Sequence, residues 1–381
     1  MRTRTIGVMA RLLEQQDGLG VYSRHVLEQL LTLDPNTHYV IFLASATASD
    51  RFAKFPNATL HVMPCASKLW WDQVLVPRAA RRFKVDLLFN PKFSLPLLTR
   101  IPGVFVLQSC DWYVNPGNYP WWDNLYIRLT LPVYCRKASG LLSISQSTLN
   151  ELRTRGGLKL PDMPITYAGV GPNFVPASSR REGFIFTVAR VLHTGLTKQP
   201  VYPGGNNERL LRAYRRYRQS TPNPLPLVVA GRGVREYLEA QGFSAGDLQG
   251  VRFLGFVPND SIHELYQRAA VFVLATLCES FGIPILEALS TGCPAIVPNT
   301  GAAPEVAGGA ARLINPYDEE DIAAALLEVT SSETLRSRLA ADGIARAHAF
   351  SWNNSARRVL DVFETVLTCA ESPVSIGPTH S

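Results

Sequence analysis

Long apolar segments are missing from this chain. No apolar stretch reaches the roughly 18 residues that a membrane-spanning helix needs, so we predict a protein without membrane spans. Of the 381 residues, 46% are hydrophobic and 18% are charged, a balance that excludes a disordered or collagen-like chain. This length is enough for two domains, each with its own core.

Patterns of metal-binding and disulfide-bonded cysteines are also missing. The six cysteines are scattered, with no C-x-x-C pair and no histidines at metal-ligand spacing. We therefore predict no structural metal and a reduced, cytoplasmic protein.

The net charge of +7 is a modest excess of one sign. It favours phosphorylated substrates or an anionic membrane surface. The basic residues form short clusters, such as Arg81-Arg82 and those of segment 212–218, which are typical of solvated surface, so we predict no nucleic-acid partner. The aromatic segment 112–134 suits a sugar ring, a membrane interface or simple packing, and peripheral membrane contact stays an open alternative.

One stretch of the second half combines a buried strand, a loop and a punctuated helix. The strand is predicted at 271–275, and the helix is predicted to begin at Pro284 and to end at Gly292. Free backbone N–H groups at the helix start lie at the positive end of its dipole and form a predicted anion site. These groups belong to Phe281, Gly282 and Ile283.

Two carboxylates flank this helix start, Glu279 and Glu287, with seven residues between them. An ionised carboxylate accepts hydrogen bonds, so each can hold a pair of hydroxyl groups while the N–H groups hold a phosphate or a sugar. By itself, this spacing also arises by chance from a surface glutamate and a helix-face glutamate.

The surrounding residues resemble a known family. The run Glu279-Ser280-Phe281-Gly282-Ile283-Pro284-Ile285-Leu286-Glu287-Ala288 resembles the E-x7-E signature of retaining glycosyltransferases with the GT-B fold, most closely family 4. Segments 292–297 and 300–306 are similar to the family's next strand and loop, and Phe350-Ser351-Trp352 to the start of its last helix.

The resemblance implies an α/β fold of two facing Rossmann-like domains with parallel sheets. It places an acceptor-binding domain at 1–172 and a nucleotide-sugar-binding domain at 173–352. Residues 353–381 are then a terminal helix that crosses back to the first domain, followed by a tail.

The first half contains two candidate site segments. A strand at 5–10, a loop with Gly18 and Gly20 and a helix at 21–33 make the first unit of a parallel sheet, and in the resembled family this loop faces the cleft. Cys110-Asp111 follows the strand at 103–108, where the family usually has His-Asp. Cys110 is either a buried packing residue, a sugar contact or a nucleophile, and the sequence leaves these open.

The second half supplies the implied phosphate ligands. Arg190 follows a strand at 184–189 and resembles the family arginine that grips the donor diphosphate. The family's partner lysine falls on Gly205 here, and Lys198 in the insertion 193–205 is the candidate replacement. A further loop resembles the one whose backbone meets the nucleotide base, namely Gly255, Phe256 and Val257.

The resemblance implies a retaining glycosyltransferase. It would move a sugar from a UDP-, GDP- or ADP-linked donor to a hydroxyl of a glycan, a glycolipid or a small molecule. The implied catalytic residues are Arg190, Glu279, Asp111 and Cys110. The resemblance also implies that neither a cofactor nor a metal is needed, with side-chain cations carrying the leaving-group charge. A non-catalytic protein that binds sugar nucleotides is the alternative, because of Cys110 and the missing lysine.

Overall fold

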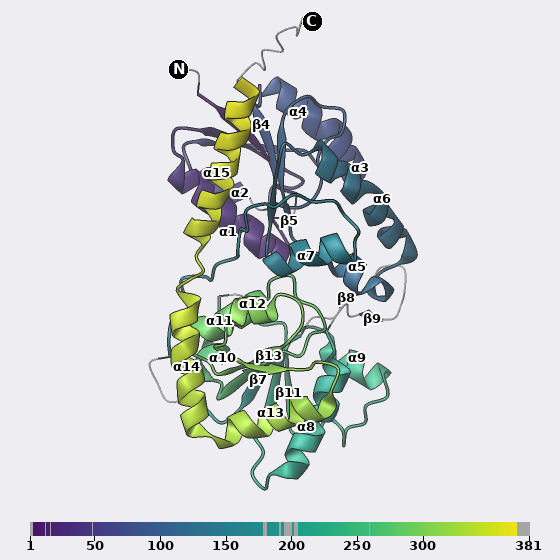
Figure 1. Ribbon diagram of the computed structural model, residues 1–381, viewed down its shortest axis with the longest axis vertical. Coiled ribbons are helices and arrows are strands. Elements are labelled where there is room, and N and C mark those ends of the chain that lie inside the picture. The colour runs from purple at the N-terminus through teal and green to yellow at the C-terminus, as the bar shows by residue number, and fades with distance from the viewer. Residues whose placement is uncertain are drawn as a thin grey trace, which may run out of the picture.

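The protein forms two α/β domains stacked along its long axis (Figure 1). This computed structural model describes residues 3–371, apart from residues 12, 16, 48, 178–180, 190–191, 194–199, 202–204 and 259. Each domain is built around one six-stranded parallel sheet. The sheets are covered by helices on both faces, as parallel sheets require.

The first sheet has the strand order β3-β2-β1-β4-β5-β6. Its strands are short apolar runs, and every residue of β5 is buried, because both faces lie under helices. The strands are β1 (Thr5–Met9), β2 (His38–Leu43), β3 (Ala58–Val62), β4 (Leu87–Asn90), β5 (Gly103–Leu107) and β6 (Gly140–Ser143). The helices are α1 (Gly18–Leu33), α2 (Ser49–Ala53), α3 (Lys68–Trp70), α4 (Val76–Arg82), α5 (Asp111–Val114), α6 (Trp121–Lys137) and α7 (Gln146–Thr154).

The second sheet repeats this plan with the order β11-β10-β7-β12-β13-β14. Its strands are β7 (Ile185–Val188), β10 (Leu227–Ala230), β11 (Val251–Gly255), β12 (Val271–Val273), β13 (Ala295–Pro298) and β14 (Arg312–Ile314). Its helices are α8 (Asn207–Ser220), α9 (Val234–Ala240), α10 (Ile262–Arg268), α11 (Ile283–Ser290), α12 (Ala303–Ala307), α13 (Glu319–Ser331) and α14 (Glu333–Ala347). Within the insertion, β8 (Leu192–His193) pairs antiparallel with β9 (Pro200–Val201).

Both sheets reverse their strand order at the same place. In the first sheet the reversal lies between β1 and β4, and in the second it lies between β7 and β12. Ligands of such sheets bind outside the carboxyl ends of the strands at this switch point. The loops that follow these four strands are therefore where a ligand is expected.

The terminal helix α15 (Trp352–Glu371) crosses back from the second domain to the first, as predicted. Trp352 stacks on His25 of α1 with ring centroids 4.9 Å apart. Further along the helix, Phe363 meets Phe89 of β4 edge to face at 5.1 Å. The predicted two-domain α/β architecture with a returning helix is thus confirmed.

The helical segment between residues 68 and 82 is broken into shorter pieces. α3 is followed by a π-helical turn (Trp71–Leu75) and then by α4. Pro77, near the start of α4, has no N–H to continue the regular hydrogen-bond ladder, and this accounts for the interruption.

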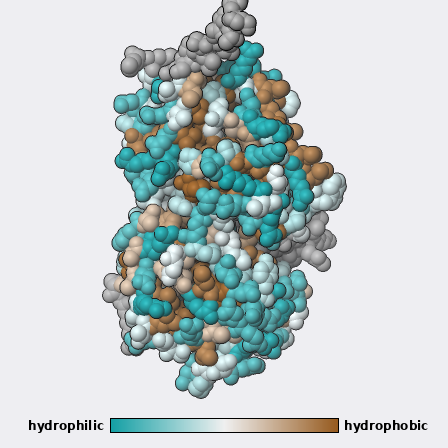
Figure 2. All heavy atoms as spheres, in the orientation of Figure 1, coloured by the Kyte–Doolittle hydropathy of each residue, from teal (hydrophilic) through white to brown (hydrophobic). Residues whose placement is uncertain are grey.

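The surface is mostly polar, but hydrophobic side chains gather at the right-hand edge of the first domain (Figure 2). This edge carries α3 and α6. Exposed aromatic side chains there include Trp70, Trp121 and Trp122.

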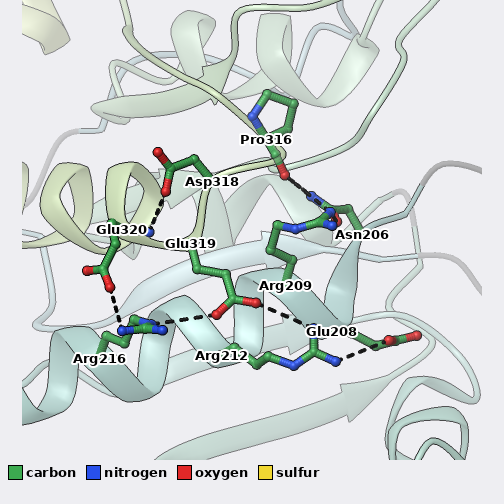
Figure 3. Close-up of polar contacts among 9 residues, drawn as sticks. All are labelled: Asn206, Glu208, Arg209, Arg212, Arg216, Pro316, Asp318, Glu319 and Glu320. Carbon is green, nitrogen blue, oxygen red and sulfur yellow. Dashed lines mark hydrogen bonds and ion pairs between the residues drawn. The ribbon is translucent and has the colours of Figure 1, made fainter.

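The basic face of α8 is paired with acidic side chains of its neighbours (Figure 3). Arg212 contacts Glu208 and Glu319, and Arg216 contacts Glu319 and Glu320 at the start of α13. Exposed pairs of this kind contribute about 0–1 kcal/mol each to stability. The basic cluster of segment 212–218 therefore lies at the surface, as predicted, and its Arg212 and Arg216 are ion-paired.

Candidate active site

The tip of helix α11 is shaped by one glycine. The helix begins at Ile283 and ends at Ser290, one and two residues before the predicted positions. Gly282 precedes it with φ of 89°, a left-handed conformation that favours glycine, and a Cβ there would lie 2.8 Å from Ile285 Cδ1. Within the described part of the chain, no hydrogen bond uses the amide groups of residues 281–283. The predicted anion-binding N–H groups are therefore unengaged there.

The two glutamates that flank this tip are held in a poorly solvated environment. Burial raises the pKa of Glu279 to about 7, and the nearby Asp111 carboxylate raises it further, against the effect of Thr276. Burial also raises the pKa of Glu287 to about 7, with the Tyr266 hydroxyl acting in the opposite direction. Perturbed carboxyl groups in a crevice are typical of functional sites.

The loop that carries Glu279 is supported by the loop after β13. The amide of Ala302 donates to the carbonyl of Glu279 at 2.8 Å, and the hydroxyl of Thr300 donates to the carbonyl of Leu277 at 3.0 Å. Between them, Gly301 has φ of 59°, and a Cβ there would lie 2.7 Å from the backbone N and O of Glu279. The position of Glu279 thus depends on a glycine in the neighbouring loop.

Gly18 and Gly20, which the sequence predicted in a loop, lie instead in the first turn of α1, because Asp17 caps the helix three residues earlier than predicted. This turn faces the α11 tip. A Cβ on Gly18 would lie 3.7 Å from Ile283 Cδ1. Gly20 donates its amide to the side chain of Asp17 at 3.0 Å, which caps α1, and a Cβ on Gly20 would collide with the carbonyl of Gln15. Gly18 therefore faces the second domain, and Gly20 lies where the backbone leaves no room for a side chain.

Asp111 reaches the cleft from the first domain. Its carboxylate accepts hydrogen bonds from Asn115 at 2.7 Å and from Tyr119 at 2.6 Å. Burial raises its pKa, and its charge in turn raises the pKa of Glu279 in the second domain. The fold thus brings together two acids that are far apart in sequence.

Cys110 is buried beside a second thiol. It is 1% exposed and lies in an apolar cluster with Phe105 and Leu107. Its neighbour is Cys278, whose pKa is raised by the contact between the thiols and by burial, so that Cys278 remains protonated. The Cys278 thiol lowers the pKa of Cys110, against the effect of burial. The 1% exposure of Cys110 favours the packing interpretation over the nucleophile, because an occluded thiol cannot reach a substrate.

The loops after β10 and β11 adjoin each other at the predicted base-binding position. The amide of Gly231 donates to the carbonyl of Gly255 at 2.7 Å, and Gly255 has φ of 67°. Phe256 is half exposed, with the guanidinium of Arg232 5.1 Å from its ring centroid. The following Val257 packs against the apolar core.

Arg190 and Lys198 lie outside the described residues, so their roles remain predictions. The chain leaves β7 at Val188, two residues before Arg190, beside β12 and its Glu279 loop. This is the switch point of the second sheet.

An interdomain contact at Glu305 was not anticipated from the sequence. Its carboxylate accepts hydrogen bonds from the amides of Gln146 at 2.8 Å and Ser147 at 2.9 Å, at the start of α7, and from the hydroxyl of Tyr167 at 2.8 Å. The carbonyl of Ser280, next to Glu279, accepts a bond from Ser145 at 2.6 Å. The sequence signal for this contact is the place of Glu305 in segment 300–306, which resembles a loop of the family.

Asn206 is a second residue whose role emerged from the structure. It has φ of 52°, and its side-chain amide donates to the carbonyls of Ala275 at 2.7 Å and Pro316 at 2.6 Å (Figure 3). It thereby ties the start of α8 to the loops after β12 and β14. The signal for it was the family's Lys-Asn pair, which reads Gly205-Asn206 here.

Similarity to known proteins decides the family. Residues 203–346 match the sequence profile described as Glycosyl transferases group 1. The O-antigen chain mannosyltransferase B of Escherichia coli is 34% identical over 291 residues, which are 75% of this chain and 76% of that protein. The chain belongs to the group 1 glycosyl transferases.

Further relatives of this glycosyl transferase agree. The phosphatidyl-myo-inositol mannosyltransferase of Mycolicibacterium smegmatis is 33% identical over 144 residues, 37% of this chain and 36% of that protein. Sucrose-phosphate synthase from Thermosynechococcus elongatus has the same fold, with a TM-score of 0.75 at 13% identity, covering 96% of this chain and all of the other. The Anabaena protein Alr3699/HepE, solved with UDP-glucose, gives a TM-score of 0.70 at 16% identity, covering 96% and 100%.

The glycosyl transferase is therefore a retaining enzyme that moves a sugar from a nucleotide sugar to an acceptor. Among the described residues, no group of three His, Cys, Asp or Glu side chains could hold a metal ion. No helix in the same part of the chain combines the length and hydropathy that crossing a membrane demands.

Proposed function

We propose that this glycosyl transferase moves mannose from a nucleoside-diphosphate mannose to a hydroxyl group of a glycan or lipid-linked acceptor. The observation that carries the choice of sugar is the 34% identity to an O-antigen chain mannosyltransferase over 75% of the chain. The mannosyltransferase of Mycolicibacterium smegmatis, similar over 37% of the chain, supports the same choice.

The donor is proposed to bind in the second domain, residues 173–352. Glu287 holds the ribose hydroxyls, and Glu279 together with the amides of residues 281–283 holds the sugar. Arg190, with Lys198 from the insertion, holds the diphosphate, and the backbone of residues 255–257 meets the base. The unengaged amides and the two crowded carboxyl groups of the α11 tip support this assignment.

The acceptor is proposed to bind in the first domain, residues 1–172, with Asp111 and Gly18 facing the sugar. The terminal helix α15 returns to this domain and covers part of its surface. A Cβ on Gly18 would lie 3.7 Å from Ile283 Cδ1, so the start of α1 and the α11 tip face each other, and this supports a shared cleft.

The proposed reaction needs few acids. Breaking the bond between the anomeric carbon and the phosphate builds negative charge on the diphosphate. The helix tip and Arg190 stabilise this charge more strongly in the transition state than in the ground state. The departing phosphate oxygen accepts the proton of the attacking hydroxyl, which approaches from the same face, so that the configuration at the anomeric carbon is retained.

A donor panel tests this function. The purified protein is incubated with GDP-, UDP- and ADP-linked mannose and glucose, and release of the nucleoside diphosphate is measured with and without acceptor glycans. We expect one mannose donor to be used at least about tenfold better than its glucose counterpart, since the two sugars differ by one hydroxyl orientation. Preference for a glucose donor would overturn the proposed sugar.

The same panel addresses the non-catalytic alternative. A sugar nucleotide that raises the melting temperature without being turned over would indicate binding alone. Glu287→Gln is the informative variant, because it removes one proposed ribose ligand while keeping the side-chain shape. We expect it to weaken the thermal shift that the donor causes.

A further inference from the structure

Helix α6 is apolar on two opposite sides. Successive residues of a helix are rotated by about 100°, which places Ile127, Leu131 and Tyr134 on one side. These three are buried. The opposite side carries Trp121, Trp122, Leu125 and Leu129, and it faces solvent, with Trp121 71% and Leu129 63% exposed. A helix that packs on one side only does not need the second apolar side for folding.

The exposed side of α6 continues onto α3. The amine of Lys68 lies 5.6 Å from the ring centroid of Tyr126, which brings α3 next to α6. Leu69 and Trp70 of α3 are 56% and 54% exposed. We call the combined surface the docking face and define it by Leu69, Trp70, Trp121, Trp122, Leu125 and Leu129. It corresponds to the hydrophobic edge of the first domain in Figure 2.

The docking face lies in a basic part of the chain. Segment 68–137 holds ten Lys or Arg residues and four Asp, a net charge of +6. Exposed members include Arg78, Arg81 and Arg82 on α4 and Arg128 and Arg136 on α6. The same segment thus combines exposed tryptophans with exposed arginines, and its binding partner has to accommodate both.

We propose that the docking face binds the surface of an anionic lipid bilayer. Exposed Trp and Leu beside Arg and Lys is the composition of elements that lie in the membrane interface, where indole rings sit at headgroup level and the cations attract anionic lipids. A second copy of the chain is a poorer occupant, because two strongly basic surfaces repel each other.

Docking in this way orients the cleft toward the bilayer. The Lys68 amine also lies 5.5 Å from the ring centroid of Phe93, which packs in the same cluster as Cys110, next to Asp111. The docking face therefore borders the first-domain wall of the cleft. An acceptor anchored in the membrane would reach that wall without leaving its lipid environment. The inference does not depend on which sugar is transferred.

Vesicle co-sedimentation of the full chain tests the proposal. Vesicles of phosphatidylcholine alone are compared with vesicles that also contain phosphatidylglycerol, at low and high salt. We expect binding to the anionic vesicles that weakens with salt. The double variant Trp121→Ser/Leu129→Ser should bind at least about tenfold more weakly, since two apolar side chains no longer leave water. Arg81→Gln/Arg82→Gln should lose several-fold affinity, and only for anionic vesicles.

Val175→Ser is the matched control, because Val175 is 51% exposed but lies outside the docking face. Its vesicle binding should equal that of the wild type, and circular dichroism should show that all variants fold. Failure of the wild type to bind anionic vesicles would overturn the proposal. So would a dimer in sedimentation velocity that Trp121→Ser/Leu129→Ser abolishes, because the face would then be an interface between copies.

Discussion

At the scale of single residues, the folded protein raises the pKa of Glu279 and of Glu287 to about 7, so each stays protonated to a higher pH than a glutamate in water. Burial is the main cause for both, and Asp111 adds to it for Glu279. A bound sugar that donates hydroxyl hydrogen bonds would favour their ionised forms. The donor, in its proposed position, would therefore offset the free-energy cost of ionising these two carboxyl groups in the folded protein.

The first prediction concerns the pH dependence of Glu279→Gln. Between pH 4.5, the ordinary pKa of a glutamate, and about 7, the folded protein keeps a proton on Glu279 that the unfolded chain has lost. The free energy of unfolding therefore falls as pH rises through this window. The amide has no such loss, so the variant should be more stable than wild type at about pH 8 and gain little at about pH 4. Urea unfolding at several pH values measures this.

The same variant should lose transferase activity by about 100-fold or more, because a group that is proposed to hold the reacting sugar is altered. His25, whose pKa burial lowers to about 4, gives the opposite pH slope, but it cancels in the difference between variant and wild type. Glu264→Gln, at an exposed position of α10, is the control. A stability difference that is constant with pH would contradict the raised pKa.

The second prediction concerns Cys110→His, which restores the residue type usual in the resembled family. Cys110 is 1% exposed and packed beside Cys278, so the larger imidazole should overpack the site and cost about 1–3 kcal/mol in the free energy of unfolding. Cys278→Ala in the same chain should recover part of this loss, because the two positions share one space. Thermal unfolding measures both. Cys369→His, at an exposed position, is the control; a Cys110→His protein as stable as wild type would show that the ring has room.

At the scale of elements, the start of α7 links the two domains. Its first amides bind the carboxylate of Glu305 from α12, and its capping Ser145 binds the carbonyl of Ser280 beside Glu279. A carboxylate at a helix N-terminus is favoured by the helix dipole. The contact therefore holds the first domain against the loop that carries Glu279.

The third prediction concerns Glu305→Gln, which keeps the shape of the side chain but removes its charge. The interdomain contact should weaken, with a fall in kcat/KM of about tenfold that arises mostly from a higher KM. Small-angle scattering should show a larger radius of gyration, because the closed arrangement is less populated. Glu364→Gln, exposed on α15, is expected to change neither quantity. Unaltered kinetics together with unaltered scattering would mean that Glu305 does not hold the domains together.

At the scale of the whole molecule, helix α15 completes the first domain although it follows the second in the chain. Trp352 stacks on His25, the Ser355 hydroxyl binds the carbonyl of Tyr167, and Phe363 packs against Phe89. A Cβ on Gly140 of β6 would lie 2.7 Å from Val362, so the helix lies directly on the sheet. The stability of the first domain thus depends on the last residues of the chain that the structure describes.

The fourth prediction concerns Phe363→Ala. Phe363 is 2% exposed, and its removal should leave a cavity that costs about 3–5 kcal/mol in the free energy of unfolding. Urea denaturation measures the loss. Hydrogen exchange should locate it, with faster exchange in β4 and β6 and little change in β10 and β13. Arg358→Ala, exposed on the same helix, is the control. Equal loosening of both sheets would show that α15 does not belong to the first domain alone.

The sequence by itself determined the sheets, the helix tip and the family. Short apolar runs separated by glycine and proline predict buried parallel strands, and the Glu279 to Glu287 spacing marks the α11 tip, because these signals depend only on residues close together in the chain. Only the tertiary structure decided which distant residues meet. Three features depend on contacts between distant segments, and no local sequence pattern predicts them. They are the contact between the free thiols of Cys110 and Cys278, the hydrogen bonds of Glu305 to α7, and the exposure of one side of α6.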